Sequence, residues 1–118
     1  MKEKAANKDK KIFSPDVAST ITAVFGCKWS IKILNAIEAG INRPGAMEKA
    51  LPGLTTRVQS YYFARMRKLG IIDKVSYPEI PPRVEYRLTD YGRRILEILR
   101  YINAVQQELE TEYKTKNL

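Results

Sequence analysis

The chain has 118 residues, of which 44% are hydrophobic and 29% charged, values typical of one globular domain of ordinary composition. It contains one cysteine, Cys27, and no histidine, so an intrachain disulfide and a zinc site of the Cys/His type are both excluded. The net charge of +8 indicates a polyanionic partner, of which nucleic acid suits a small domain best. The alternative is a basic surface without such a partner.

The N-terminal residues 1–11 carry five lysines and two acids, a composition that predicts a disordered basic tail ahead of a single domain over 12–118. No apolar run reaches the length of a membrane span, and no apolar segment follows the lysine-rich start. We therefore expect a cytoplasmic protein without a membrane partner.

Two short helices are predicted next. Ser14 and Pro15 fit the cap and first position of a helix whose apolar stripe ends at Gly26. A second helix, over about 28–39, buries an apolar face that includes Trp29 and ends at Gly40. Trp29 is interpreted as a core residue rather than a platform for a ligand.

A helix-turn-helix follows. Pro44 can open a third helix to about Leu51, and Pro52-Gly53 makes the turn before a helix over 55–69. Helical periodicity places Val58, Tyr62, Phe63, Met66 and Leu69 on one face of that helix. The other face is small, polar and basic, which suits insertion into a DNA groove, although it is also what any solvated helix face presents. The residues expected to contact DNA are Thr55, Thr56, Arg57, Ser60, Tyr61, Ala64 and Lys68.

A hairpin follows the helix, with strands over 71–77 and 83–88 in which apolar and polar residues alternate. Three prolines stiffen the intervening tip, and this lowers the entropic cost of ordering it on binding. Lys74 and Arg83 are the candidate wing contacts to phosphate or to the minor groove, whereas Glu79 at the tip argues against a purely electrostatic wing.

The last helix, from about Asp90 into the 108–113 region, has an apolar face broader than one small core requires. A broad apolar face on a terminal helix indicates packing against a second subunit, with packing on the first helix of the same chain as the alternative. The residues expected at a dimer interface are Ile21, Val24, Ile95, Leu99, Ile102, Val105 and Leu109.

Together these elements predict a mainly α (α+β) fold, a winged helix-turn-helix with a two-stranded wing and a long C-terminal dimerisation helix. The function indicated is a regulator that binds double-stranded DNA in a sequence-specific way. The alternative is an architectural or protein-interaction module without sequence readout. An enzyme is not indicated, since the chain lacks histidine, a phosphate-binding glycine loop and paired carboxylates. We accordingly expect no catalytic residue, metal or cofactor.

The chain resembles the HxlR-type transcriptional regulators, a branch of the MarR-like winged-helix proteins. The resemblance covers roughly residues 14–110 and is strongest over Tyr77-Pro78-Glu79-Ile80-Pro81-Pro82-Arg83-Val84-Glu85-Tyr86-Arg87-Leu88-Thr89, followed by Tyr91-Gly92. Shorter matching runs are Gly26-Cys27-Lys28-Trp29, Ala50-Leu51-Pro52-Gly53-Leu54-Thr55 and Leu69-Gly70-Ile71-Ile72.

The resemblance implies a homodimer, formed mainly by terminal helices, that binds a palindromic or pseudo-palindromic operator as a repressor or activator. Several members of the family sense oxidants through a cysteine near the start of the first helix. This chain has Phe13-Ser14-Pro15-Asp16 in that region, so thiol sensing by the usual residue is not expected. Cys27, beside Lys28, is either a substitute sensor or a small inert residue at a helix entrance.

Overall fold

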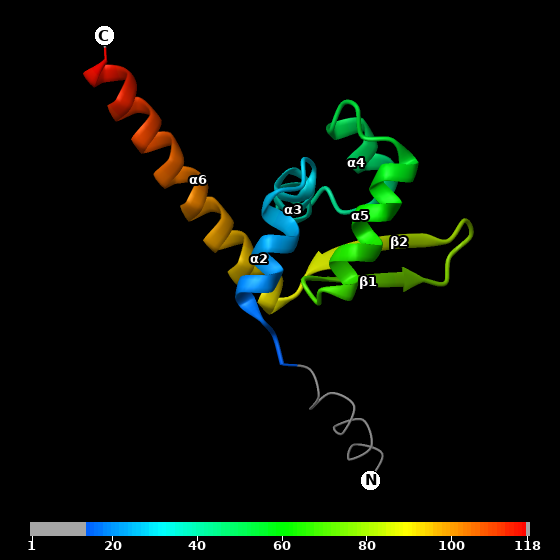
Figure 1. The fold of residues 1–118 in the computed structure, drawn as a ribbon. Helices are drawn as coiled ribbons and strands as arrows, with labels where there is room; N and C mark the ends of the chain where they lie inside the picture. Colours follow the sequence, from blue (N-terminus) through cyan, green and yellow to red (C-terminus); the bar gives the residue numbers. More distant parts are fainter. Residues whose placement is uncertain (1–13, 118) are drawn as a thin grey trace.

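The computed structural model describes residues 14–117, so the tail predicted over 1–11 lies outside the described residues. Within that range the chain forms five helices and a two-stranded sheet, in the order predicted (Figure 1). The helices are α2 (Val17–Phe25), α3 (Ser30–Glu38), α4 (Pro44–Ala50), α5 (Thr56–Lys68) and α6 (Asp90–Lys116), and the strands are β1 (Ile72–Tyr77) and β2 (Arg83–Leu88).

The first two helices begin later than the sequence predicts. The carboxylate of Asp16, rather than the hydroxyl of Ser14, caps α2 by accepting a hydrogen bond of 3.1 Å from the backbone N–H of Ser19. Asp is among the strongest N-cap residues, which explains why the cap lies two residues further along the chain. Residues 27–29 form a turn, so α3 begins only at Ser30.

The helix-turn-helix has the predicted boundaries. Pro44 occupies the first turn of α4, and the hydroxyl of Thr55 caps α5 by accepting from the N–H of Val58 at 3.2 Å. Gly53, in the turn, has a φ of +93°, a conformation that favours glycine. A Cβ on Gly53 would lie 3.6 Å from the ring of Trp29, so this ring packs against the turn, as expected for a core residue.

The sheet is a simple antiparallel hairpin in which Ile72 pairs with Leu88 and Tyr77 with Arg83. This register puts Ile72, Val84 and Tyr86 on the face that covers the core, and Val75 and Tyr77 on the opposite face. The ring of Tyr86 stacks on that of Phe63 in α5, with ring centroids 3.8 Å apart. Helix α5 and the hairpin therefore share one packed core.

Apolar residues from all five described helices and from both strands form the core. Its fully buried members include Ile33, Leu34, Met47, Met66, Ile71, Ile72, Ile95, Leu96 and Leu99. Hydrogen bonds of Tyr91 and Thr89 help to fix α6 against this core. Tyr91 shares a hydrogen bond of 2.7 Å with Thr20 of α2, and Thr89, the cap of α6, donates to the carbonyl of Gly70 at 2.7 Å.

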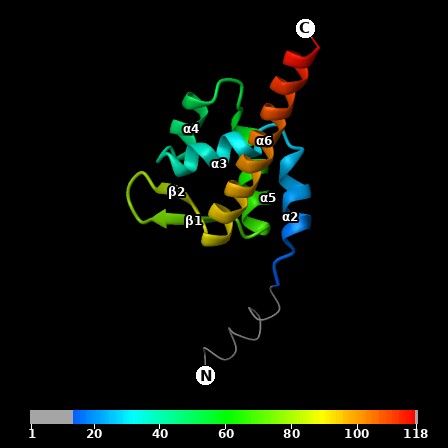
Figure 2. The same cartoon turned by 90° about the vertical axis from the view of Figure 1, so that its left-hand side faces the viewer.

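The long helix α6, of 27 residues, has a buried part and an exposed part. Its first turns supply Ile95, Leu96 and Leu99 to the core, whereas residues 106–117 are all exposed. Figure 2 shows this second part of α6 projecting beyond the rest of the domain. Over residues 14–117, no single helix combines the length and hydropathy of a membrane span. The bent pair of α2 and α3 reaches that composition only when the two are counted together.

Candidate nucleic-acid interface

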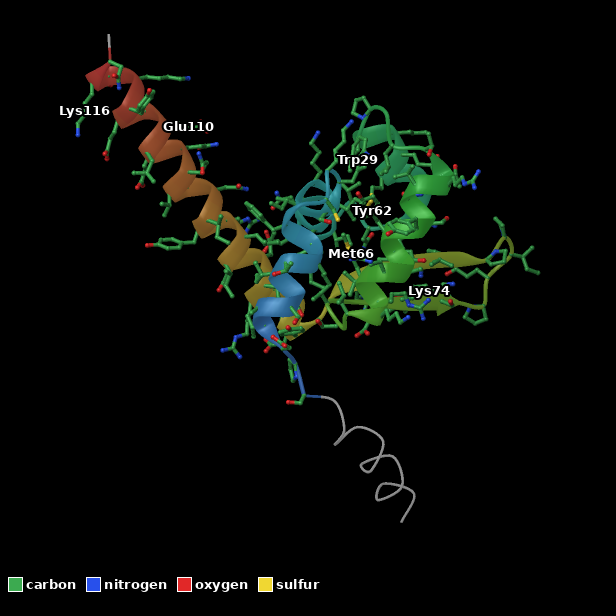
Figure 3. The ribbon with its side chains drawn as sticks, in the orientation of Figure 1. Trp29, Tyr62, Met66, Lys74, Glu110 and Lys116 are labelled. Atoms are coloured by element: carbon green, nitrogen blue, oxygen red, sulfur yellow. The ribbon has the colours of Figure 1, made fainter. Side chains whose placement is uncertain are left out.

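The outward face of α5 is free of acidic side chains. Residues 55–68 contain no Asp or Glu, and the predicted contact residues Arg57, Ser60, Tyr61, Ala64 and Lys68 are all exposed. The opposite face packs on the core as predicted, with Phe63 and Met66 buried and Tyr62 turned toward α3 (Figure 3). A helix with this division presents only neutral and cationic groups to a polyanion, which is the requirement for entry into a DNA groove.

A basic groove separates α5 from β1. Ala64 and Lys68 of α5 line it together with Lys74 of β1, so the structure brings these three predicted contact residues to one place. Figure 3 shows Lys74 on the strand beside the second half of α5. The groove holds about 630 Å³ and is lined by one acid, Asp73.

Arg67 also lines this groove and is exposed, yet the sequence interpretation did not include it. Helical periodicity does predict that Arg67 lies on the outward face of α5. Position 67 follows Ser60 by seven residues and therefore lies within about 20° of it around the helix axis. Arg67 adds a third cation to the groove, beside Lys68 and Lys74.

Arg83 is engaged within the wing. Its guanidinium lies 3.1 Å from the carboxylate of Glu79, 3.7 Å from that of Glu85 and 3.9 Å above the ring centre of Tyr77. These contacts neutralise part of its charge and hold it on the face of the hairpin that does not pack on the core. Lys74 is thus the more available cation of the two wing candidates.

A second groove, of about 590 Å³, lies between the start of α4 and the start of β2. It contains three cations, Arg43, Lys49 and Arg83, and no acidic residue lines it. The sequence interpretation missed Arg43 and Lys49 because they lie outside the helix that periodicity identified as the DNA-reading element. They place a second group of cations beside the start of α4.

The start of α5 differs from a free helix terminus. Thr55 uses its hydroxyl as the helix cap, and the hydroxyl of Thr56 donates to the carboxylate of Glu48 at 2.9 and 3.0 Å. The side chain of Gln59 donates to the same carboxylate at 2.8 Å. Thr55 and Thr56, both expected to contact DNA, are exposed, and their hydroxyls are hydrogen-bonded within the protein.

The residues predicted at a dimer interface fall into two groups. Val24, Ile95 and Leu99 are 0–1% exposed in the single chain, so they belong to its core and are not available to a partner. Ile21, Ile102 and Val105 are half-buried, and Leu109 is exposed. The expected interface thus joined two parts of one apolar face of α6. The first turns complete the monomer core, whereas the part with Ile102, Val105 and Leu109, the open stripe, remains partly or fully exposed.

Further apolar side chains lie on the open part of α6. Ile98, Tyr101 and Tyr113 are exposed, together with Val17 and Phe25 of α2. Large exposed apolar side chains on two neighbouring helices are typical of an interaction surface. This surface lies at the other end of the molecule from the wing tip, so a partner seated there would leave α5 and the wing open (Figures 1 and 2).

Cys27 is half-buried, and its thiol donates to the carbonyl of Ala23 at 3.3 Å. The same carbonyl lies 3.5 Å from the guanidinium of Arg65, which reaches it from α5. Among residues 14–117, no three His, Cys, Asp or Glu side chains come together as metal ligands would.

Comparisons with known proteins agree with this geometry. The model of a family described as HxlR-like helix-turn-helix matches residues 24–114. An HTH-type transcriptional regulator of Synechocystis sp. is 44% identical over 72 residues, which cover 61% of this chain and 53% of the relative. The HTH-type transcriptional regulator YtcD of Bacillus subtilis is 31% identical over 81% of this chain and 75% of its own length. The chain thus spans about half of the first relative and three quarters of the second.

Among solved structures, a transcriptional regulator of the MarR family from Enterococcus faecalis superimposes with a TM-score of 0.73 at 26% identity. The superposition covers 88% of this chain and 96% of that one. The predicted winged helix-turn-helix, with its two-stranded wing and long last helix, is therefore confirmed. These relatives are transcriptional regulators rather than enzymes.

Proposed function

The chain belongs to the HxlR-like helix-turn-helix family, and we propose that it is a transcriptional regulator that binds double-stranded DNA at specific sequences. The observation that carries the proposal is the exposed, acid-free face of α5 beside the basic groove it shares with β1. A module that bound only proteins would have no need of five basic and one acidic residue over 55–74.

In this proposal α5 lies in the major groove. Arg57, near the start of the helix and exposed, is placed to bond the edge of a guanine with two N–H groups. Arg67, Lys68 and Lys74 contact the phosphates that border the groove, and these contacts fix the position of the helix without reading sequence. Ala64 leaves room for the close approach of the sugar–phosphate backbone.

We further propose that the protein works as a homodimer on a palindromic or pseudo-palindromic operator. One α5 spans too few base pairs for useful specificity, and two related by a two-fold axis reach half-sites roughly 34–36 Å apart. The open stripe of α6, with Ile102, Val105 and Leu109, supplies the interface together with Ile21 of α2. Chromosomal DNA as the partner places its action in the cytoplasm of a bacterial or archaeal cell.

The proposal is tested with DNA selected from a random duplex library by the purified protein. We expect the selected duplex to bind at least a thousandfold more tightly than an unrelated one at physiological salt. The logarithm of the binding constant should fall with the logarithm of salt concentration with a slope of several units, since each neutralised phosphate contributes about 0.9. A flat salt response would rule out groove binding by α5.

The same measurement separates the proposal from a winged-helix architectural module. Such a module would show the steep salt dependence but equal affinity for the selected and unrelated duplexes. Footprints of two half-sites on one face of the selected duplex would support the dimer, and a single protected half-site would count against it.

A further inference from the structure

A carboxylate from α4 lies against the first turn of the recognition helix. Glu48 accepts hydrogen bonds from the hydroxyl of Thr56, at 2.9 and 3.0 Å, and from the side-chain amide of Gln59 at 2.8 Å. Both donors belong to α5, and they lie three residues apart, one turn of the helix. One side chain of α4 therefore holds two residues of α5 that lie one helical turn apart.

The amide of Gln59 shows how closely this arrangement is fixed. Gln59 is 1% exposed and lies among the apolar residues of the α5 face that packs on the core. Its Nε2 is bonded to Glu48, while its Oε1 is buried with no hydrogen-bond partner in the part of the chain that the structure describes. The amide is thus oriented by the carboxylate alone, because the reverse orientation would set an oxygen against an oxygen.

The negative charge of Glu48 also affects how the start of α5 meets a phosphate. The first N–H groups of a helix lack partners and carry a partial positive charge, so they attract any phosphate whatever the base sequence beside it. Glu48 sets a negative charge within hydrogen-bond distance of Thr56, the first residue of α5. Its half-buried position keeps that charge at the edge of the surface that faces DNA.

We propose that Glu48 is a specificity-determining residue, which orients α5 through Gln59 and Thr56 and repels phosphates that approach the helix terminus without the correct bases. The inference rests on the proposed DNA-binding function and adds a residue outside α5 to the reading of sequence. Specificity is a difference between two affinities, so the charge raises discrimination only by penalising complexes with unrelated duplexes, in which a phosphate lies against the helix terminus, more than the operator complex, in which base contacts hold α5 in place.

The test uses the full chain with three variants. Glu48→Gln removes the charge and keeps the shape and one acceptor oxygen. Gln59→Leu keeps the charge but removes the buried amide, and because Gln59 cannot touch DNA, its effect on binding must pass through the position of α5. Glu97→Gln, on an exposed position of α6, is the control for loss of one negative charge.

Binding constants are measured at one salt concentration for the duplex selected by the wild type and for an unrelated duplex. The specificity ratio is the binding constant for the selected duplex divided by that for the unrelated duplex. Glu48→Gln should bind the unrelated duplex about threefold more tightly, and its specificity ratio should fall about tenfold. Gln59→Leu should lower the ratio with no gain on the unrelated duplex. Glu97→Gln should match the wild type in both. Circular dichroism and thermal unfolding establish that each variant is folded, so a lower ratio cannot be attributed to lost structure.

An unchanged ratio in folded Glu48→Gln would overturn the inference, and an unchanged ratio in Gln59→Leu would overturn its positioning step. These outcomes leave the proposed function intact, because the wild type would still prefer its selected duplex. A wild-type ratio near one would instead remove the proposed function, and the role of Glu48 with it.

Discussion

The ring of Phe63 lies nearly parallel to the ring of Tyr86, with centroids 3.8 Å apart and planes inclined by 21°. Phe63 belongs to the recognition helix and Tyr86 to the second strand of the wing. Both side chains are buried, and burial raises the pKa of the Tyr86 phenol, while the nearby Arg67 opposes that shift. The two elements that we propose as the DNA-binding surface are therefore joined by an aromatic contact.

Phe63→Ala should destabilise the protein by about 3–5 kcal/mol, the usual cost of removing a buried phenylalanine together with the cavity it leaves. Tyr86→Phe keeps the stacked ring and should cost far less. Chemical denaturation monitored by circular dichroism checks both. Equal free energies of unfolding for Phe63→Ala and the wild type would show that the stacking is not part of the core.

Arg57→Ala should weaken binding to the selected duplex by roughly 1–3 kcal/mol and relax the preference at one base pair, if Arg57 bonds a guanine. Lys74→Ala, a phosphate contact in this proposal, should weaken selected and unrelated duplexes about equally. Binding titrations on duplexes varied at each position distinguish the two. No change in affinity or base preference for Arg57→Ala would mean that α5 presents another face to DNA.

Ile102→Glu should split the proposed dimer, because a charge on the open stripe of α6 would be desolvated in the interface. Operator binding should fall with it, while the fold of α5 stays intact. Thr111→Glu places the same charge nine residues further on, about 180° around the helix, and should leave the dimer unchanged. Sedimentation of the wild type as a monomer with full-strength operator binding would refute the interface.

Gly92→Ala should destabilise the protein even though alanine is the better helix former. A Cβ at position 92 would overlap the carbonyl oxygen of Ile71 and lie 2.8 Å from its carbonyl carbon, so backbone must move. We expect a cost of about 1–3 kcal/mol. Gly45→Ala, in α4 with no atom within 4 Å of its Cβ position, is the control and should be neutral or stabilising. Thermal unfolding of both variants provides the comparison.

The cap of α2 should respond to pH. Hydrogen bonds from Ser19 hold the pKa of the Asp16 carboxyl below its ordinary value, so the stabilisation is present above the unfolded-state pKa of about 3.9 and is lost as pH falls through the lower folded-state value. Asp16→Ala should therefore have a lower melting temperature than the wild type at pH 6. The difference should vanish at acid pH, and a difference that persists there would contradict a role for the ionised carboxylate.

The order of the elements and the buried face of α5 were predictable because each depends on local signals. Proline, glycine and capping residues mark where helices begin and end, and the 3.6-residue period separates Phe63 and Met66 from Arg57 and Lys68. The same period carries Gln59 onto the buried face, seven residues before Met66. The burial of Gln59 is nevertheless hard to predict from sequence, because an amide is an unusual core side chain and its partner, Glu48, lies on another helix.

Contacts between elements could not be predicted from such local signals in the sequence. Alternation within β1 and β2 predicts strands but not their register, and it was the register that separated Val75 and Tyr77 from Val84 and Tyr86. Likewise, one apolar stripe on α6 can serve the core or a partner. Ile95 and Leu99 are buried in the core because α2 and α3 pack against that part of α6.

Thr89 joins three elements at one point. Its hydroxyl donates to the carbonyl of Gly70, just after α5, and accepts from the N–H of Gly92 in α6, while its own N–H donates to Ile71 at the entrance to β1. Within one chain, the long helix α6 thus has little freedom to turn against α5 and the hairpin. In a dimer, an operator whose half-sites are one base pair too close or too far apart could be accommodated only by sliding one α6 along the other, or by deforming the DNA.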